Sequence, residues 1–171
     1  MISPVRWDGD RLVLLDQTRL PSLEVERAYT SWPEVADAIR SLVVRGAPAI
    51  GVTAAFGVAL AARESHATTF DGLLADLETA IKGLAATRPT AVNLFWALER
   101  MRHCCLDHRT LPLDALKARL LQEAQKVLDE DVAANRAMGS HGATLVPNGA
   151  RILTHCNAGA LATAEIGRAH V

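Results

Sequence analysis

The sequence contains few of the residues that mark several common classes of protein. Three of its 171 residues are cysteines, and two of them, Cys104 and Cys105, are adjacent, so a disulfide framework is excluded. Lysine and arginine number 18 against 19 aspartates and glutamates, with no basic run, so nothing indicates nucleic acid or an anionic membrane as a partner. The start, Met1-Ile2-Ser3-Pro4, lacks a signal-peptide pattern. We therefore expect a protein of the reducing cytoplasm.

Long hydrophobic runs are also missing. The longest uncharged run, from Gly46 to Ala62, is shorter than a bilayer span and is interrupted by Pro48, Gly51 and Gly57. Its richness in alanine favours a helix buried in a protein core. Because half of the residues are apolar, the chain can build such a core and is not disordered.

Periodicity predicts a small β element followed by helices. Two short strands flank the turn signal Asp8-Gly9-Asp10, and the alternation over 23–29 predicts a third strand. The capping-box pattern Ser31-Trp32-Pro33-Glu34 begins a helix that we expect Gly46 to end. Apolar residues at helical spacing predict further helices, at 48–62, 70–84, 92–101 and 112–137.

The stretch near the carboxyl end has a different pattern. The apolar run Ile152–Thr154 predicts a buried strand, Cys156 follows in a turn of small residues, and 160–164 resembles a helix start. A thiol facing the free N–H groups of a helix start has a lowered pKa, and that setting suits an anionic substrate. The alternative is a small buried cysteine that only fills space. We place a domain boundary near 139–149, giving domains at 1–145 and 146–164.

The last seven residues, Glu165–Val171, do not continue this strand-turn-helix pattern. The codons GAG ATC GGA AGA GCA CAC GTC would encode them, and that string contains a widely used sequencing-adapter sequence. We hypothesise that natural sequence ends at about Ala164 and that 165–171 is adapter read-through. Finding the same codons in intact genomic DNA would refute this hypothesis.

Two segments place an arginine directly before a helix start that contains proline. The first is Arg45-Gly46-Ala47-Pro48, and the second is Arg88-Pro89-Thr90-Ala91. Helix-start N–H groups and a forked guanidinium would together hold a phosphate. Alternatively, Arg45 complements the dipole of the preceding helix with Gly46 as a C-cap, while Thr90 and Asn93 are ordinary caps. Both junctions together favour a site for a phosphorylated small molecule.

A metal site was considered at His103-Cys104-Cys105 with His108. The spacing fits no strong zinc pattern, so we predict no metal there. A direct pair between His155 and Cys156 is also doubtful, because adjacent residues of a strand face opposite ways.

Four stretches together resemble the methylthioribose-1-phosphate isomerases, a branch of the wider family that includes the regulatory subunits of the translation factor eIF2B. The resemblance covers essentially all of residues 5–164, and the cysteine turn with the first arginine junction is specific to the isomerase branch. The four stretches are Leu15–Pro21, Val43–Gly51, Arg88–Leu94 and Thr154–Ala164.

The resemblance implies an α/β protein: a mainly helical amino-terminal domain with a small β element, then a Rossmann-like domain of which this chain holds only the start. It implies an aldose-ketose isomerase of methionine salvage that uses no metal or redox cofactor, takes a sugar-phosphate substrate and assembles as a homodimer. The residues that match the family's substrate-binding and catalytic positions are Arg45, Gly46, Ala47 and Arg88 for binding and Cys156 for catalysis.

The family's general acid/base aspartate matches no position in residues 1–164. We therefore expect the 171-residue chain alone to be inactive. Two alternatives remain open. One is a related isomerase of another sugar 1-phosphate, such as ribose 1,5-bisphosphate, and the other is a non-catalytic regulatory subunit that binds sugar phosphate or nucleotide.

Overall fold

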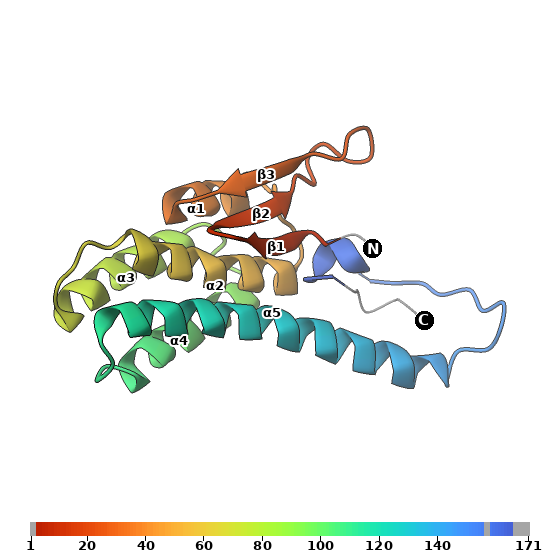
Figure 1. Cartoon of the computed structure of the whole chain (residues 1–171). Coiled ribbons are helices and arrows are strands. Elements are labelled where there is room, and N and C mark those ends of the chain that lie inside the picture. Colours follow the sequence, from red (N-terminus) through yellow and green to blue (C-terminus); the bar gives the residue numbers. More distant parts are fainter. Residues whose placement is uncertain (1–2, 156–157, 166–171) are drawn as a thin grey trace.

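The structure, a computed structural model, describes residues 3–155 and 158–165 (Figure 1). Three antiparallel strands lie at the amino terminus, and five α-helices follow. The strands are β1 (Val5–Asp8), β2 (Arg11–Leu15) and β3 (Glu26–Tyr29), and the helices are α1 (Trp32–Arg40), α2 (Ala47–Glu64), α3 (Phe70–Ala85), α4 (Val92–Asp107) and α5 (Leu113–Ala143). A 3-10 turn, η1 (Ala160–Ala162), lies near the end of the described chain. A mainly helical fold with a small antiparallel sheet is thus confirmed.

The sheet has the order β1-β2-β3, with Val5 paired to Leu14 and Leu12 paired to Tyr29. The predicted hairpin is therefore confirmed. The third strand was predicted over 23–29, but β3 covers only Glu26–Tyr29. Trp7 of β1 stacks on Phe56 of α2, with ring centroids 5.4 Å apart. This contact packs the sheet against the central helix.

Helix α2 is the centre of the core. Every residue from Ala49 to Ala62 is buried, as expected of a helix that is apolar on all sides. The other four α-helices and the sheet pack around it. No helix in the described part of the chain has both the length and the apolar character needed to cross a bilayer.

The predicted end of the first helix is wrong. Helix α1 ends at Arg40, and Leu42 then takes a left-handed backbone conformation with φ of 65°. Gly46 is instead the N-cap of α2, with φ of 90°. The apolar residues Val43 and Val44 are buried in the connecting loop, which explains why they continued the helical pattern in the sequence.

The longest helix exceeds its prediction, because α5 continues through Gly139 and Gly142 to Ala143. The chain then doubles back, and η1 lies beside the first turn of α2 (Figure 1). The two-domain division stays a prediction.

The predicted buried strand at Ile152–Thr154 is not formed. The segment is outside any strand, and the exposed fractions of Ile152 and Leu153 are 58% and 97%. A buried strand needs neighbouring strands, and no described strand pairs with this segment. The predicted α-helix at 160–164 is likewise replaced by the single 3-10 turn η1.

Candidate active site

Two helix starts meet beside one cavity. A Cβ atom added to Gly51 of α2 would lie 2.9 Å from the carbonyl oxygen of Asn93 in α4, so glycine allows these helices to approach closely near their amino-terminal ends. A cavity of about 840 Å³ lies there and receives residues from the β2–β3 loop, the α1–α2 loop, both helix starts and η1. Its lining consists of Gln17, Leu20, Pro21, Leu42, Arg45, Gly46, Ala47, Ile50, Arg88, Thr90, Ala91 and Leu161.

All four predicted substrate-binding residues line this cavity. Arg45, Gly46 and Ala47 come from the start of α2, and Arg88 comes from the loop before α4. The predicted catalytic residue, Cys156, lies outside the described residues. Their roles remain predictions, but the two arginine junctions do line one cavity.

The arginine side chains of the cavity have no partner among the described residues. Neither the Arg45 nor the Arg88 guanidinium forms a hydrogen bond or ion pair there. Most other arginines in the described part of the chain are paired with a carboxylate, namely Arg6, Arg11, Arg27, Arg40, Arg63, Arg100, Arg102, Arg119 and Arg136. Two guanidinium groups beside one cavity are therefore available to an anionic ligand.

The helix starts add to this positive character. Among the five described α-helices, only α2 and α4 have no acidic residue in the first turn, and neither has a side-chain N-cap hydrogen bond. The suggestion that Thr90 and Asn93 cap α4 is wrong, because its N-cap is Ala91. Neither helix thus supplies an anion of its own to its free N–H groups and its dipole.

Gly46 is required by its surroundings. Its φ of 90° disfavours any residue with a side chain, and an added Cβ atom would lie 2.4 Å from both the Cα and the carbonyl oxygen of Ala162. The backbone of η1 therefore packs directly on the arginine junction. This contact connects the start of α2 to the segment that follows Cys156.

Sequence reasoning missed several residues of the cavity. Leu20, Pro21, Leu42, Ile50 and Leu161 form apolar lining, and Gln17 adds a polar side chain. Gln17, Leu20 and Pro21 belong to a stretch that carried the family resemblance, which was the available signal. The sequence alone assigns no role to these three residues. They are far from Arg45 and Arg88 along the chain, and only the fold brings them to the same cavity.

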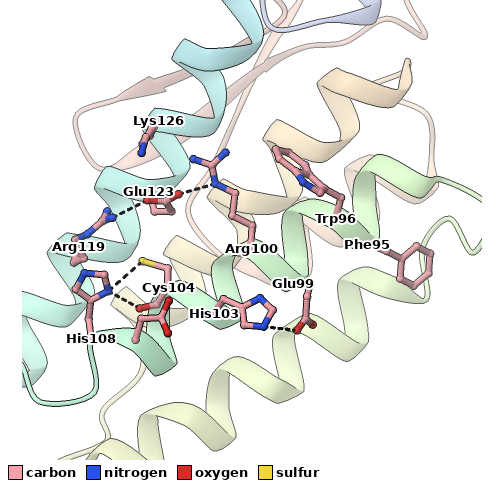
Figure 2. Close-up of a pocket in the computed structure, with 11 residues that line it drawn as sticks. Phe95, Trp96, Glu99, Arg100, His103, Cys104, His108, Arg119, Glu123 and Lys126 are labelled. Carbon is pink, nitrogen blue, oxygen red and sulfur yellow. Dashed lines mark hydrogen bonds and ion pairs between the residues drawn. The ribbon is translucent and has the colours of Figure 1, made fainter.

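A second cavity lies between α4 and α5. Its volume is about 850 Å³, and its lining includes Phe95, Trp96, Arg100, Arg119 and Glu123 (Figure 2). The two arginines and Glu123 already have partners. Arg100 Nε donates to Glu123 Oε1 at 2.6 Å, and Arg119 Nη2 donates to the other oxygen of Glu123 at 2.8 Å.

Of the four residues in the Cys/His group, His103, Cys104 and His108 line this α4–α5 groove, and Cys105 does not. Cys104 Sγ is 4.0 Å from His108 Nδ1, and that nitrogen also lies 2.9 Å from the Cys104 carbonyl oxygen. Burial raises the pKa of Cys105 to about 11, so its thiol is unreactive at neutral pH. Within the described residues, no three His, Cys, Asp or Glu side chains are grouped so as to hold a metal ion.

Comparisons with known proteins agree on one family. The Initiation factor 2 subunit family matches residues 43–171. The methylthioribose-1-phosphate isomerase of Geobacter sulfurreducens is 52% identical over 165 residues, which is 96% of this chain and 48% of that protein. The isomerase of Syntrophotalea carbinolica is 53% identical over 168 residues, which is 98% of this chain and 49% of that protein.

Two solved structures have the same fold. The crystal structure of 5-methylthioribose 1-phosphate isomerase from Pyrococcus horikoshii has a TM-score of 0.91 at 46% identity, covering 98% of this chain and 47% of that one. The translation initiation factor eIF-2B subunit delta from A. fulgidus has a TM-score of 0.85 at 44% identity, covering 96% of this chain and 48% of that one. The chain spans about half the length of the curated relatives it matches.

Proposed function

Because the chain belongs to the Initiation factor 2 subunit family, we propose that the protein isomerises 5-methylthioribose 1-phosphate to 5-methylthioribulose 1-phosphate. The observation that carries the proposal is one cavity that brings two arginines and two helix starts together. The side chains of Arg45 and Arg88 have no partner among the described residues, and neither helix has an acidic residue in its first turn. The proposed reaction is that of the relatives named methylthioribose-1-phosphate isomerase, which are 52% and 53% identical to this chain in sequence.

The substrate phosphate is held at the helix starts. Guanidinium groups donate paired hydrogen bonds to phosphate oxygens, and first-turn N–H groups donate along the helix axis. In α2 the Pro48 nitrogen has no hydrogen, so the N–H groups of Ala47 and Ala49 are the relevant donors. Arg45 and Arg88 then neutralise the charge of the bound phosphate.

The reaction needs help with proton movement. Phosphate on the anomeric oxygen prevents simple opening to a free aldehyde, so the bond between C1 and the ring oxygen must break with protonation of that oxygen. C2 loses its hydrogen and its hydroxyl proton and becomes a carbonyl, while C1 gains one hydrogen, so substrate and product are isomers. We assign to the Cys156 thiol a part in this proton movement or in stabilising the developing charge.

The lining of the cavity also suits the methylthio group of this substrate. Besides its arginines, the cavity has the apolar side chains of Leu20, Pro21, Leu42, Ile50 and Leu161. Burying a methylthio group against an apolar surface is favourable. Because the cavity holds two arginines, ribose 1,5-bisphosphate stays the alternative substrate that an assay must separate.

The general acid/base aspartate implied by the family resemblance matches no residue of this chain. We propose that it belongs to a Rossmann-like domain of the whole protein, which acts as a cytoplasmic homodimer. Under this proposal we expect no turnover by the 171-residue chain alone. Turnover by the purified chain would contradict that statement.

The decisive experiment compares two cysteine variants of the intact protein. We expect Cys156→Ala to lower kcat for 5-methylthioribose 1-phosphate by about 10³-fold or more with little change in affinity, as for loss of a group that acts in the chemical step. Cys104→Ala is the matched control, because burial raises the pKa of that thiol. Equal turnover by both variants would contradict the catalytic role of Cys156.

A regulatory subunit is the second candidate, favoured by the structural likeness to the eIF-2B delta chain. It requires a binding site but no thiol chemistry. Under that alternative the wild-type protein binds the sugar phosphate without turning it over, and Cys156→Ala changes nothing. Turnover of 5-methylthioribose 1-phosphate and of ribose 1,5-bisphosphate, measured side by side with the intact protein, separates the two isomerase alternatives.

A further inference from the structure

Gln17 joins two segments that are far apart in the sequence. The residue is buried, with an exposed fraction of 7%. Its backbone N–H donates to the Val43 carbonyl oxygen at 3.0 Å, and its side-chain Nε2 donates to the Leu161 carbonyl oxygen at 2.8 Å. Val43 lies two residues before Arg45, and Leu161 lies in η1. One glutamine therefore links the arginine junction to the segment after Cys156.

The loop that carries Gln17 is itself held firmly. Asp16 is fully buried, and its carboxylate accepts hydrogen bonds from the backbone N–H of Thr18 at 3.0 Å and from Arg27 Nε at 2.7 Å. Burial alone would raise the pKa of Asp16, but hydrogen bonds from Thr18 and Arg27 outweigh it and keep the pKa below its ordinary value. Gln17 thus projects from a rigid support.

The described residues that flank positions 156–157 differ in their contacts. No hydrogen bond or ion pair joins residues 151–155 to another described residue, and Leu153 is 97% exposed. In 158–165, by contrast, Leu161 is bonded to Gln17, and the Ala164 N–H donates to Asp131 Oδ2 at 2.8 Å. Among the described residues from 151 to 165, those that bond to the rest of the protein therefore all follow position 157.

We propose that Gln17 is a positioning residue of the isomerase site, which holds η1 against the arginine junction and so fixes where the cysteine segment meets the cavity. The inference rests on the proposed function. The linkage needs an amide, because a carbonyl oxygen must receive a donor and a carboxylate has none at neutral pH. Loss of the bond also leaves the Leu161 carbonyl oxygen without its partner.

The test is Gln17→Glu in the intact protein, a change that keeps the shape of the side chain. We expect kcat to fall about 10–100-fold, as for a small misplacement of a reacting group. KM should rise as well, because Gln17 lines the cavity and a carboxylate there repels an anionic substrate. The neutral variant Gln17→Met should show the fall in kcat with KM within about threefold of wild type. Gln122→Glu is the matched control, since Gln122 is exposed on α5. A rise in KM with unchanged kcat, or no change in either, would overturn the proposal.

The pH dependence separates positioning from a general loss of stability. A protonated glutamic acid can donate to Leu161, so kcat of Gln17→Glu relative to wild type should rise as the pH falls toward the pKa of the new carboxyl group. Gln17→Met, which has no donor at any pH, should show no such recovery. Parallel pH profiles for the two variants would contradict positioning by this hydrogen bond.

Amide hydrogen exchange makes the proposal independent of turnover. In the intact protein, the amides of 161–164 should exchange about tenfold faster in Gln17→Met than in wild type, because local opening becomes easier. If the wild type fails to turn over substrate, the proposed function fails, while faster exchange still supports the linkage. Unchanged exchange would overturn the linkage whatever the activity.

Discussion

The two cavities have similar volumes, about 840 and 850 Å³, but they differ in how their charged groups are paired. In the α4–α5 groove, Arg100 and Arg119 are bonded to Glu123 (Figure 2). Arg100 also pairs with Glu130. In the cavity at the helix starts, Arg45 and Arg88 have no partner among the described residues. The N-cap of α4, Ala91, lines one cavity, and the body of the helix lines the other.

The comparison shows that volume alone does not identify a functional site. A buried carboxylate must be paired to be tolerated, so the groove's charges serve the stability of the helix pair. Guanidinium groups without internal partners, placed beside free helix N–H groups, instead remain available to an anion from solution. Substitutions in the two regions should therefore affect different measured quantities.

The largest effect should come from the unpaired arginines. We expect Arg45→Gln or Arg88→Gln each to lower kcat/KM by about 10–100-fold, and the double variant by about 10³-fold, because each removes a charge-assisted hydrogen bond to phosphate. The melting temperature should hardly change, since neither side chain has an internal partner. Arg40→Gln, which removes an exposed pair on α1, is the control for activity. Normal turnover by the double variant would refute the site.

The next effect concerns the contact between the cavity and η1. Gly46→Ala should lower the free energy of unfolding by about 2–3 kcal/mol, because it places a side chain at positive φ and against the Ala162 backbone. Gly142→Ala is the matched control. It lies inside α5 with nothing within 4 Å of an added Cβ, and should stabilise by about 0.5–1 kcal/mol. Urea unfolding of the intact protein measures both, and equal shifts would contradict close packing at Gly46.

In the groove, stability rather than activity should respond. Arg100→Gln should lower the free energy of unfolding by about 1–2 kcal/mol, because buried Glu123 loses one of its two arginine partners. The substitution also removes the guanidinium that lies 5.5 Å from the Trp96 ring centroid. The measured kcat/KM should stay within about twofold of wild type. A loss of activity as large as that of Arg45→Gln would make the groove part of the functional site.

The smallest effect is a pH dependence of stability in the same groove. Burial would raise the pKa of Glu123, but hydrogen bonds from Arg100 and Arg119 outweigh it and lower the pKa. The resulting stability is present above the unfolded-state pKa of about 4.3 and is lost as the pH falls through the lower folded-state value. Wild type should therefore lose on the order of 1 kcal/mol relative to Glu123→Gln on this acid limb. Parallel curves for the two proteins would contradict the pairing.

Local signals in the sequence predicted much of the fold. The hairpin around Asp8-Gly9-Asp10, the buried helix α2 and the amphipathic helix α3 were expected and are present. Each depends on periodicity and on residues that favour turns or caps, which act over a few positions of the chain. Predictions at element ends were weaker, as the early end of α1 at Arg40 shows.

Long-range contacts account for what the sequence did not reveal. The hydrogen bond between Gln17 and Leu161 joins residues that are 144 positions apart, and no local pattern encodes it. The strand expected at Ile152–Thr154 failed for a related reason. An apolar run is compatible with a strand, but strand formation requires neighbouring strands, whose presence the run itself does not specify.

The sequence by itself determined that two arginines stand before two helices that start without acidic residues, because Pro48 and Pro89 mark those junctions locally. Tertiary structure decided that the junctions share one cavity. That outcome depends on the close approach of α2 and α4 at Gly51 and on the packing of η1 against Gly46. These are contacts between distant segments, and their free energy is gained only when the helices pack together.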